Sequence, residues 1–208
     1  MARRKKAPEG FHKEQIAEAA GRLFMQKGIE GTSMNDIVKE SGYGKATVYV
    51  YFKNKDEIIG LLALNSMKIL LGKIKIVVNE NKTCEEQYYG ICSELVSFQN
   101  EFPDYFIIAM SSINVDLESD DILETEKETY CVGQQINEVL EKFIRTGIEN
   151  KELNNDLLLP QTIFSLWGAI SGIIIMGNNK EEYIKKTMNM NKKQFLDYSF
   201  KLLFKTLK

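Results

Sequence analysis

The sequence contains few of the residues on which most catalytic and metal sites depend. His12 is its only histidine, which excludes Ser-His-Asp and Cys-His catalysis, HExxH zinc sites and histidine proton shuttles. Its three cysteines, Cys84, Cys92 and Cys131, form no CxxC pair and are too few for a disulfide framework. So few cysteines favour a reducing compartment, and we expect a cytoplasmic protein with no metal and no cofactor.

Long apolar runs are also scarce. The basic start of the chain is not followed by the ~7 to 15 apolar residues of a signal peptide. The longest uncharged run, 157–179, is interrupted by Pro160 and several polar residues. Its densest apolar part, 166–176, is shorter than the ~20 residues that a membrane-spanning helix needs. We therefore expect a buried helix in this run and no membrane partner.

The rest of the composition is typical of a packed globular protein. The chain has 208 residues, of which 44% are hydrophobic and 27% charged, enough for one large domain or two small ones. Residues 1–55 contain eleven Lys and Arg against six Asp and Glu, a net charge of +5, whereas residues 56–208 carry −7. If this division is not chance clustering, it suggests that only the N-terminal segment approaches a polyanion.

Apolar spacing and capping signals predict helices along almost the whole chain, whereas β signals are scarce. In the basic segment we expect helices over 11–27, 34–41 and 45–52. Ser33 with Asp36 marks the start of the second helix, and Gly42 marks its end. Asn54 with Glu57 opens a fourth helix over 55–78.

Further starts are expected near Thr83, Pro103, Ser119 and Pro160, and a last helix over 191–207. The sequence thus predicts an all-α fold. We divide it into a three-helix domain, 1–54, and a larger helical domain, 55–208.

Two short helices around Gly42-Tyr43-Gly44 have the length and composition of a helix-turn-helix. In DNA readers of this kind, the second helix places its leading side chains in the major groove. Here Lys45 can donate to guanine, Thr47 can bond a base edge or a phosphate, and Ala46 can touch a thymine methyl group. The same geometry also serves simply to pack two helices, so the motif alone leaves DNA binding open.

Two further residues of this segment suit the DNA backbone. The Tyr49 hydroxyl can reach a phosphate, and Lys55 places positive charge beside the exposed amides of the next helix start. Such contacts set the register of a reader on the duplex rather than its sequence preference.

Residues 15–59 resemble the DNA-binding domain of the TetR (tetracycline repressor-like) family. The matching positions are Ile16-Ala17-Glu18-Ala19-Ala20, Leu23-Phe24, Gly28, Gly31-Thr32-Ser33, Asp36-Ile37, Gly42, Thr47-Val48-Tyr49 and Tyr51-Phe52-Lys53-Asn54-Lys55-Asp56-Glu57. The match covers about a quarter of the chain, and its run from Thr47 to Glu57 is specific.

The resemblance implies a homodimeric, all-helical transcription factor, usually a repressor, with a ligand-binding domain built from the acidic part of the chain. By position, the DNA contacts of the family carry over to Ser33, Asn35, Lys45, Ala46, Thr47, Tyr49 and Lys55.

Two positions depart from the family pattern. Val50 stands where a polar or aromatic residue able to reach the DNA backbone is frequent, and Gly44 stands where serine is common. One phosphate contact is therefore missing. The N-terminal Arg3 and Arg4, with the two lysines that follow, either replace it by entering a minor groove or are simply solvated.

Aromatic residues of the acidic part are expected to line an effector pocket. An apolar cavity edged by hydroxyls would suit a hydrophobic or aromatic small molecule, although each of these side chains can equally fill the core. The set comprises Tyr89, Phe98, Phe102, Tyr105, Phe106, Met110, Tyr130, Phe164 and Trp167.

Two helices of this part are apolar on more than one face, which predicts a dimer interface. The residues concerned are Gly168 and Gly172 in one helix and Phe195, Tyr198 and Leu202 in the other. A helix that is hydrophobic around most of its circumference must bury a second face, so pairing with a twin subunit in a four-helix bundle is expected. Burial within one subunit is the alternative.

An acidic cluster over 116–121 fails the test for a calcium loop, because it has no glycine at the sixth position and Lys127 replaces the required glutamate.

Taken together, these features predict a ligand-responsive, sequence-specific regulator, a repressor released from a palindromic operator in double-stranded DNA, with no catalytic step. Two alternatives stay open: a ligand-independent architectural DNA-binding protein, and an enzyme with a DNA-binding appendage.

Overall fold

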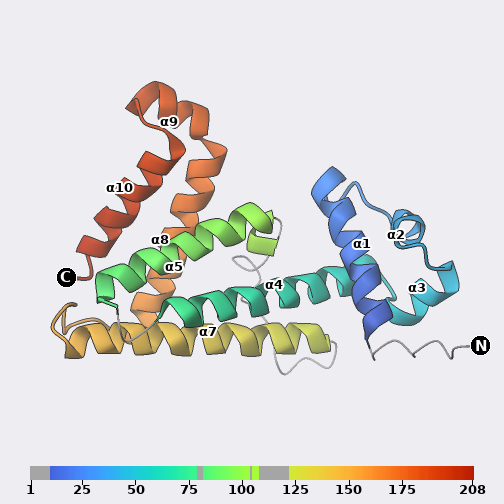
Figure 1. Cartoon of the computed structure of the whole chain (residues 1–208), viewed down its shortest axis with the longest axis horizontal. Coiled ribbons are helices and arrows are strands. Elements are labelled where there is room, and N and C mark those ends of the chain that lie inside the picture. Colours follow the sequence, from blue (N-terminus) through green and yellow to red (C-terminus); the bar gives the residue numbers. More distant parts are fainter. Residues whose placement is uncertain (1–9, 79–81, 104, 108–121) are drawn as a thin grey trace, which may run out of the picture. The chain divides into compact units, whose positions relative to one another are not determined.

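The computed structural model describes residues 10–78, 82–103, 105–107 and 122–208, and every regular element in these ranges is an α-helix (Figure 1). The all-α class predicted from the sequence is confirmed. The described residues form two compact units. The first takes in 10–65 and 122–129, and the second takes in the rest. The boundary placed at 54/55 from the sequence stays a prediction.

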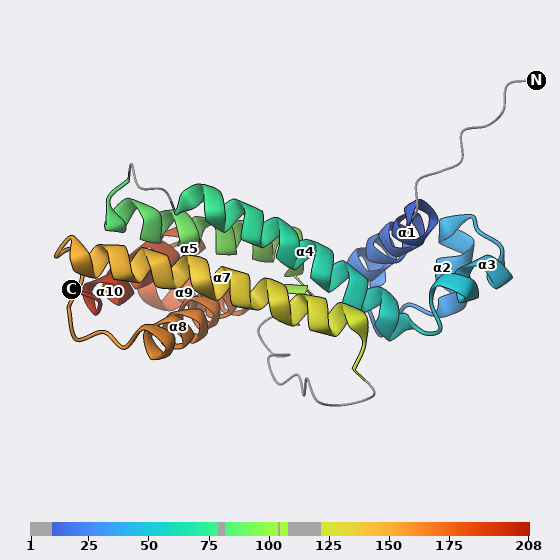
Figure 2. The ribbon, with the colours of Figure 1, turned by 90° about the horizontal axis from the view of Figure 1, so that it is seen from below.

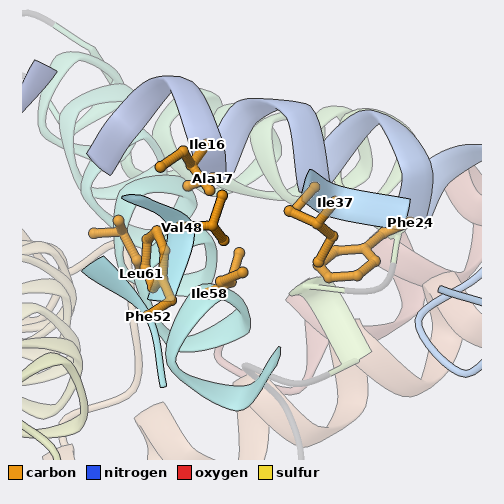
Figure 3. Packing of buried hydrophobic residues seen from close by; sticks show 9 residues of the cluster. Ile16, Ala17, Phe24, Ile37, Val48, Phe52, Ile58 and Leu61 are labelled. Carbon is orange, nitrogen blue, oxygen red and sulfur yellow. The ribbon is translucent and has the colours of Figure 1, made fainter. Parts of the chain in front are cut away.

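The first unit is built from three short helices and the start of a long one. They are α1 (Phe11–Lys27), α2 (Met34–Ser41), α3 (Lys45–Tyr51) and the first part of α4 (Lys55–Val77). One apolar side chain or more from each helix enters a common core, in which no side chain exceeds 7% exposure (Figure 3). The labelled members of this core are Ile16, Ala17, Phe24, Ile37, Val48, Phe52, Ile58 and Leu61.

Among the described residues, the second unit contains the C-terminal part of α4 and several further helices. These are α5 (Cys84–Glu101), α7 (Glu124–Glu149, whose first residues belong to the first unit), α8 (Leu159–Asn179), α9 (Glu181–Met188) and α10 (Lys192–Lys205). The C-terminal part of α4 runs beside α7 in both views (Figure 1, Figure 2). α10 packs on α5 and α8, and the Tyr88 hydroxyl donates to the Phe200 carbonyl at 3.1 Å.

The capping signals read from the sequence act as expected. Ser33 Oγ accepts from Asp36 N at 3.2 Å, while Ser33 N donates to Asp36 Oδ2 at 2.9 Å. Both backbone amides, which have no partner within the helix, thus have an acceptor. Asn54 Oδ1 likewise accepts from Glu57 N at 3.0 Å at the start of α4. Gly42 ends α2 in the left-handed conformation, with φ 71°, which a side chain would strain.

α8 differs from the sequence-based expectation. Within the uncharged run, α8 is one uninterrupted helix of 21 residues, long and apolar enough to cross a membrane by length and composition alone. The core helix of a soluble protein meets the same criterion. Only 22% of this stretch is buried, so the predicted burial holds for one face only. The opposite face is exposed, as Phe164 and Met176 show.

A short helix that the sequence did not predict, α9, separates α8 from α10. It ends at Asn189, which adopts the left-handed conformation with φ 52°. Asn tolerates this conformation better than most residues, which explains why the chain turns there without glycine.

Candidate nucleic-acid interface and effector region

α3 has one buried face and one exposed face. Val48 is fully buried in the core of the first unit, and Phe52, which follows the helix, is 1% exposed. The four side chains predicted to read DNA from this helix, those of Lys45, Ala46, Thr47 and Tyr49, are all exposed. The core contacts of α3 therefore fix the helix while leaving its leading side chains free for a ligand.

Lys45 and Tyr49 lie one turn apart and contact each other. The ammonium group of Lys45 lies 5.8 Å from the centroid of the Tyr49 ring. A cation–π contact at such an exposed site contributes about 0.5–1 kcal/mol. This contact brings the two side chains together on the exposed face of α3.

Ser33 and Asn35 at the start of α2 differ in availability. The Ser33 hydroxyl donates to Asp36 Oδ2 at 2.6 Å in addition to its capping bond. Hydrogen bonds from the Ser33 hydroxyl and amide, followed by the Lys27 ammonium, hold the pKa of Asp36 well below its usual value. Asn35 is exposed and its amide makes no hydrogen bond to the described residues, so it is the freer of the two donors.

Lys55 has a structural role that the sequence did not indicate. Its Nζ donates to the Ile29 carbonyl at 2.7 Å and to the Thr32 carbonyl at 3.3 Å. An ammonium group has three N–H donors, so one remains for a phosphate. Lys55 thus ties the start of α4 to the loop between α1 and α2. No local sequence signal predicts this contact, because its partners lie 26 and 23 residues away.

His12 also has a partner that sequence reasoning missed. Its Nδ1 shares a 2.8 Å hydrogen bond with the Tyr43 hydroxyl, and the two rings meet edge to face. The Tyr51 ring lies 6.5 Å from the imidazole. The single histidine therefore joins the start of α1 to the turn between α2 and α3.

Some predicted residues lie outside the described part of the chain. These are Arg3 and Arg4 with the neighbouring lysines, the pocket residue Met110, and the acidic cluster over 116–121.

The predicted pocket aromatics do not meet in one cavity. Phe98 forms a cluster with Phe102 and Phe106, with ring centroids 5.6 and 6.2 Å away, and Tyr105 joins it through Phe102. The other members lie apart: Tyr89 packs on Tyr88 and Phe204, Trp167 lines a separate cavity, Tyr130 is half-buried on α7, and Phe164 is 57% exposed on α8.

The cavity beside Trp167 lies among α5, α7 and α8 and is small. Its volume is about 20 Å³, and its walls are apolar apart from the Tyr88 and Trp167 polar groups. The Trp167 indole N–H donates to Asn137 Oδ1 at 3.2 Å. Typical small-molecule pockets measure ~300 to 1,000 Å³, so an effector here must displace the walls.

A wider groove of about 870 Å³ lies between α5 and α10. Of the predicted pocket residues only Tyr89 lines it, so sequence reasoning missed this groove. Its apolar floor includes Cys92, whose burial raises the pKa of the thiol to about 12. Three lysines and two carboxylates also line the groove, so the groove does not select a ligand of one charge sign. They are Lys192, Lys193, Lys201, Glu181 and Asp197.

The predicted dimer residues lie on open faces of α8 and α10. Tyr198 and Leu202 are 61% and 54% exposed, and a Cβ added at Gly168 or Gly172 would meet no atom of another element within 4 Å. Phe195 is half-buried and lines a hollow of about 320 Å³ with residues of α8 and α9. Within the described residues, these faces remain without a covering element.

The first unit, with a buried core and the leading side chains of α3 turned to solvent, defines a helix-turn-helix DNA-binding regulator. Residues 16–62 match the sequence profile of the family described as bacterial regulatory proteins, tetR family. The chain is a transcriptional regulator of the TetR family.

Relatives along most of the chain agree with this assignment. The uncharacterised HTH-type transcriptional regulator YvdT of Bacillus subtilis is 26% identical over 82% of this chain and 81% of its own length. AcrR of Shigella flexneri, also an HTH-type regulator, is 25% identical over 84% of this chain and 81% of its own length. The crystal structure of the regulator FadR from Bacillus subtilis in complex with stearoyl-CoA shares the fold, with a TM-score of 0.67 at 18% identity over 92% of this chain and 97% of FadR.

Proposed function

We propose that this regulator is a repressor that binds a palindromic operator as a homodimer and leaves it when a small apolar effector binds. The observation that carries the proposal is the exposed row Lys45, Ala46, Thr47 and Tyr49 on a helix fixed by the buried Val48. Each protomer would place this row in one major groove, with the half-sites roughly 34 to 36 Å apart. The chain would act in the cytoplasm by binding alone, with no catalytic step.

Direct readout is assigned to the first turn of α3. Lys45 would donate to guanine O6 or N7, Thr47 would bond a base edge or a phosphate, and Ala46 would touch a thymine methyl group. Tyr49, Asn35 and the remaining N–H of Lys55 are assigned to phosphates, with the basic N-terminal residues as an added arm.

The homodimer is assigned to the exposed faces of α8 and α10. The exposed aromatic and aliphatic side chains of these faces would meet their copies in a four-helix bundle, with Gly168 and Gly172 permitting close approach. An isologous interface of this kind also explains why so apolar a helix as α8 leaves one face uncovered in a single chain.

The effector is assigned to the apolar region among α5, α7 and α8. Its cavity of about 20 Å³ is too small for such a molecule, so the effector must favour a conformer in which these helices separate. α4 is one continuous helix from Lys55 to Val77, which gives movement in the second unit a route to the first. The shift in DNA affinity can only equal the differential affinity of the effector for the two conformers.

The DNA-binding half of the proposal is tested with two lysine variants on an operator selected from random duplexes. Lys45→Ala should relax the base preference at one position of each half-site, at a cost of about 1–3 kcal/mol for the preferred base. We also assign Lys53, an exposed residue just beyond α3, to a phosphate, so Lys53→Ala should weaken all sequences alike and reduce the salt slope by ~0.9 per site. A uniform loss for both variants contradicts the base-reading role of Lys45.

The effector half is tested by crystallography and by operator release. Fluorescence anisotropy of the labelled operator should report release by apolar probes, among which long-chain acyl-CoA is worth including because FadR binds stearoyl-CoA. Structures with and without the releasing probe should differ in the separation of the two α3 helices of the dimer. An unchanged separation contradicts the proposed release mechanism.

A further inference from the structure

Val50 is the most exposed large apolar side chain among the described residues, at 79%. Val48, two positions earlier in the same helix, is fully buried. At 3.6 residues per turn, two residues are about 200° apart, so Val50 faces directly away from the core that Val48 enters. These two valine side chains therefore lie on opposite faces of α3. Packing in the core accounts for the valine at position 48 but not for the one at position 50.

The exposed side of Val50 is the side that carries the proposed DNA-reading residues. Ala46 lies one turn before Val50 at the i, i+4 spacing, which places both on one strip of the helix. Neither side chain has a hydrogen-bond donor or acceptor. The Lys45 ammonium and Tyr49 ring flank this strip and contact each other at 5.8 Å. The reading face thus has an apolar strip beside a polar one.

Chemistry selects one partner for an apolar strip in the major groove. The only apolar group that base pairs present there is the C5-methyl group of thymine. Val50 has no group that can bond a phosphate, so it cannot make the backbone contact expected at this position from the family pattern.

We propose that Val50 is a specificity-determining residue that contacts a thymine C5-methyl group in each half-site, next to the methyl contact of Ala46. The proposal rests on the proposed operator binding. Four residues advance a helix by about 6 Å. Base pairs are about 3.4 Å apart along the duplex. With α3 lying along the groove, the two thymines are therefore about two base pairs apart.

The test removes single methyl groups from the DNA. In the selected operator, each thymine is replaced in turn by deoxyuridine, which lacks only the C5-methyl group, and affinity is measured for the full chain and for Val50→Ala. Replacing the thymine that Val50 contacts should weaken binding by the wild-type chain about fourfold, the factor equivalent to ~0.8 kcal/mol for one buried methyl-sized group. The same replacement should leave the affinity of Val50→Ala nearly unchanged.

Ile76→Ala is the matched control, because Ile76 is 76% exposed on the part of α4 that belongs to the second unit. This variant should retain the full wild-type response to every deoxyuridine. The inference is overturned if each replacement weakens the wild-type chain and Val50→Ala by the same factor, or if the selected half-site contains no thymine. A chain that selects no site at all overturns the proposed operator binding as well.

Discussion

At the scale of single residues, the two lysines that sequence position marks as DNA contacts behave differently. Lys45 stands exposed at the start of α3, whereas the head of Lys55 donates to two backbone carbonyls. The difference comes from the loop between α1 and α2, which presents the Ile29 and Thr32 carbonyls to the Lys55 ammonium group. Lys55 therefore contributes to the stability of the first unit before it contributes to DNA binding.

Lys55→Met should lower the free energy of unfolding by about 1.5–3 kcal/mol, the usual contribution of hydrogen bonds to a charged group. Urea unfolding of the full chain, with a probe in the first unit, measures the change. Lys53→Met is the control, because this exposed side chain makes no hydrogen bond or ion pair to the described residues and should change stability by less than ~0.5 kcal/mol. Equal losses for the two variants would contradict the structural role of Lys55.

The three cysteines should differ in reactivity. Burial and the nearby Glu152 carboxylate raise the pKa of Cys84 to about 12, and burial raises the pKa of Cys92 to about 12, whereas Cys131 is exposed. Thiolate is the reactive form, so a disulfide reagent at neutral pH should modify one thiol in the folded chain and three in urea. Cys131→Ser should abolish the fast reaction, and rapid modification of two or more thiols in the folded chain contradicts this account.

The raised pKa values of the Cys84 and Cys92 thiols determine how stability changes with pH. Both must stay protonated in the folded chain, while an unfolded thiol titrates near its ordinary value of 9.0. Their contribution to stability is therefore complete below pH 9.0 and is lost as the pH rises towards 12.

At the scale of elements, the turn between α2 and α3 depends on two glycines with different conformations. Gly42 has φ 71°, whereas Gly44 has φ −62° and precedes α3 without a side-chain cap. Only Gly42 needs to be glycine on backbone grounds. A residue with a capping side chain in place of Gly44 would therefore stabilise the start of α3.

The same substitution should have opposite effects at these two positions. Gly42→Ser places a side chain in the left-handed region and should destabilise the first unit by about 1–3 kcal/mol. Gly44→Ser supplies an N-cap to α3 and should stabilise it by a few tenths of a kcal/mol, ~0.3. Thermal unfolding monitored by circular dichroism measures both shifts. Destabilisation by Gly44→Ser as large as that by Gly42→Ser would contradict the capping assignment.

Local signals account for what the sequence predicted at this scale. The caps at Ser33 and Asn54 act over three residues, and both helix starts were predicted. Contacts over long chain separations, such as that between His12 and Tyr43, 31 residues apart, leave no such signal. The aromatic pocket set fails to converge for the same reason, because packing decides which aromatic side chains meet. The helix-turn-helix pattern did lead us to expect Lys45 and Tyr49 at the surface, and both are exposed on α3.

At the scale of the whole molecule, the uncovered faces of α8 and α10 imply a partner. Only 22% of the apolar stretch of α8 is buried, and Tyr198 and Leu202 of α10 are more than half exposed. Large apolar faces of this kind mark interaction sites in soluble proteins. We propose that a second copy of the chain covers both faces, which would also supply the second reading helix that a palindrome needs.

Replacing Tyr198 and Leu202 together by lysine should convert a dimer into a monomer, because like charges would then be buried against their copies. Light scattering after size-exclusion chromatography gives the mass. Ile76→Lys is the control, since it charges an even more exposed apolar residue outside α8 and α10 and should leave the dimer intact. A double variant that remains dimeric would contradict the assigned interface.

Selection from random DNA tests the central claim most directly, namely that a symmetric pair of α3 helices reads two half-sites. The full chain is incubated with a pool of randomised duplexes, and bound DNA is amplified and sequenced over successive rounds. We predict enrichment of an inverted repeat whose half-sites lie about one helical turn, or a multiple of it, apart. An unenriched pool, or a single half-site without its inverted copy, would contradict the claim.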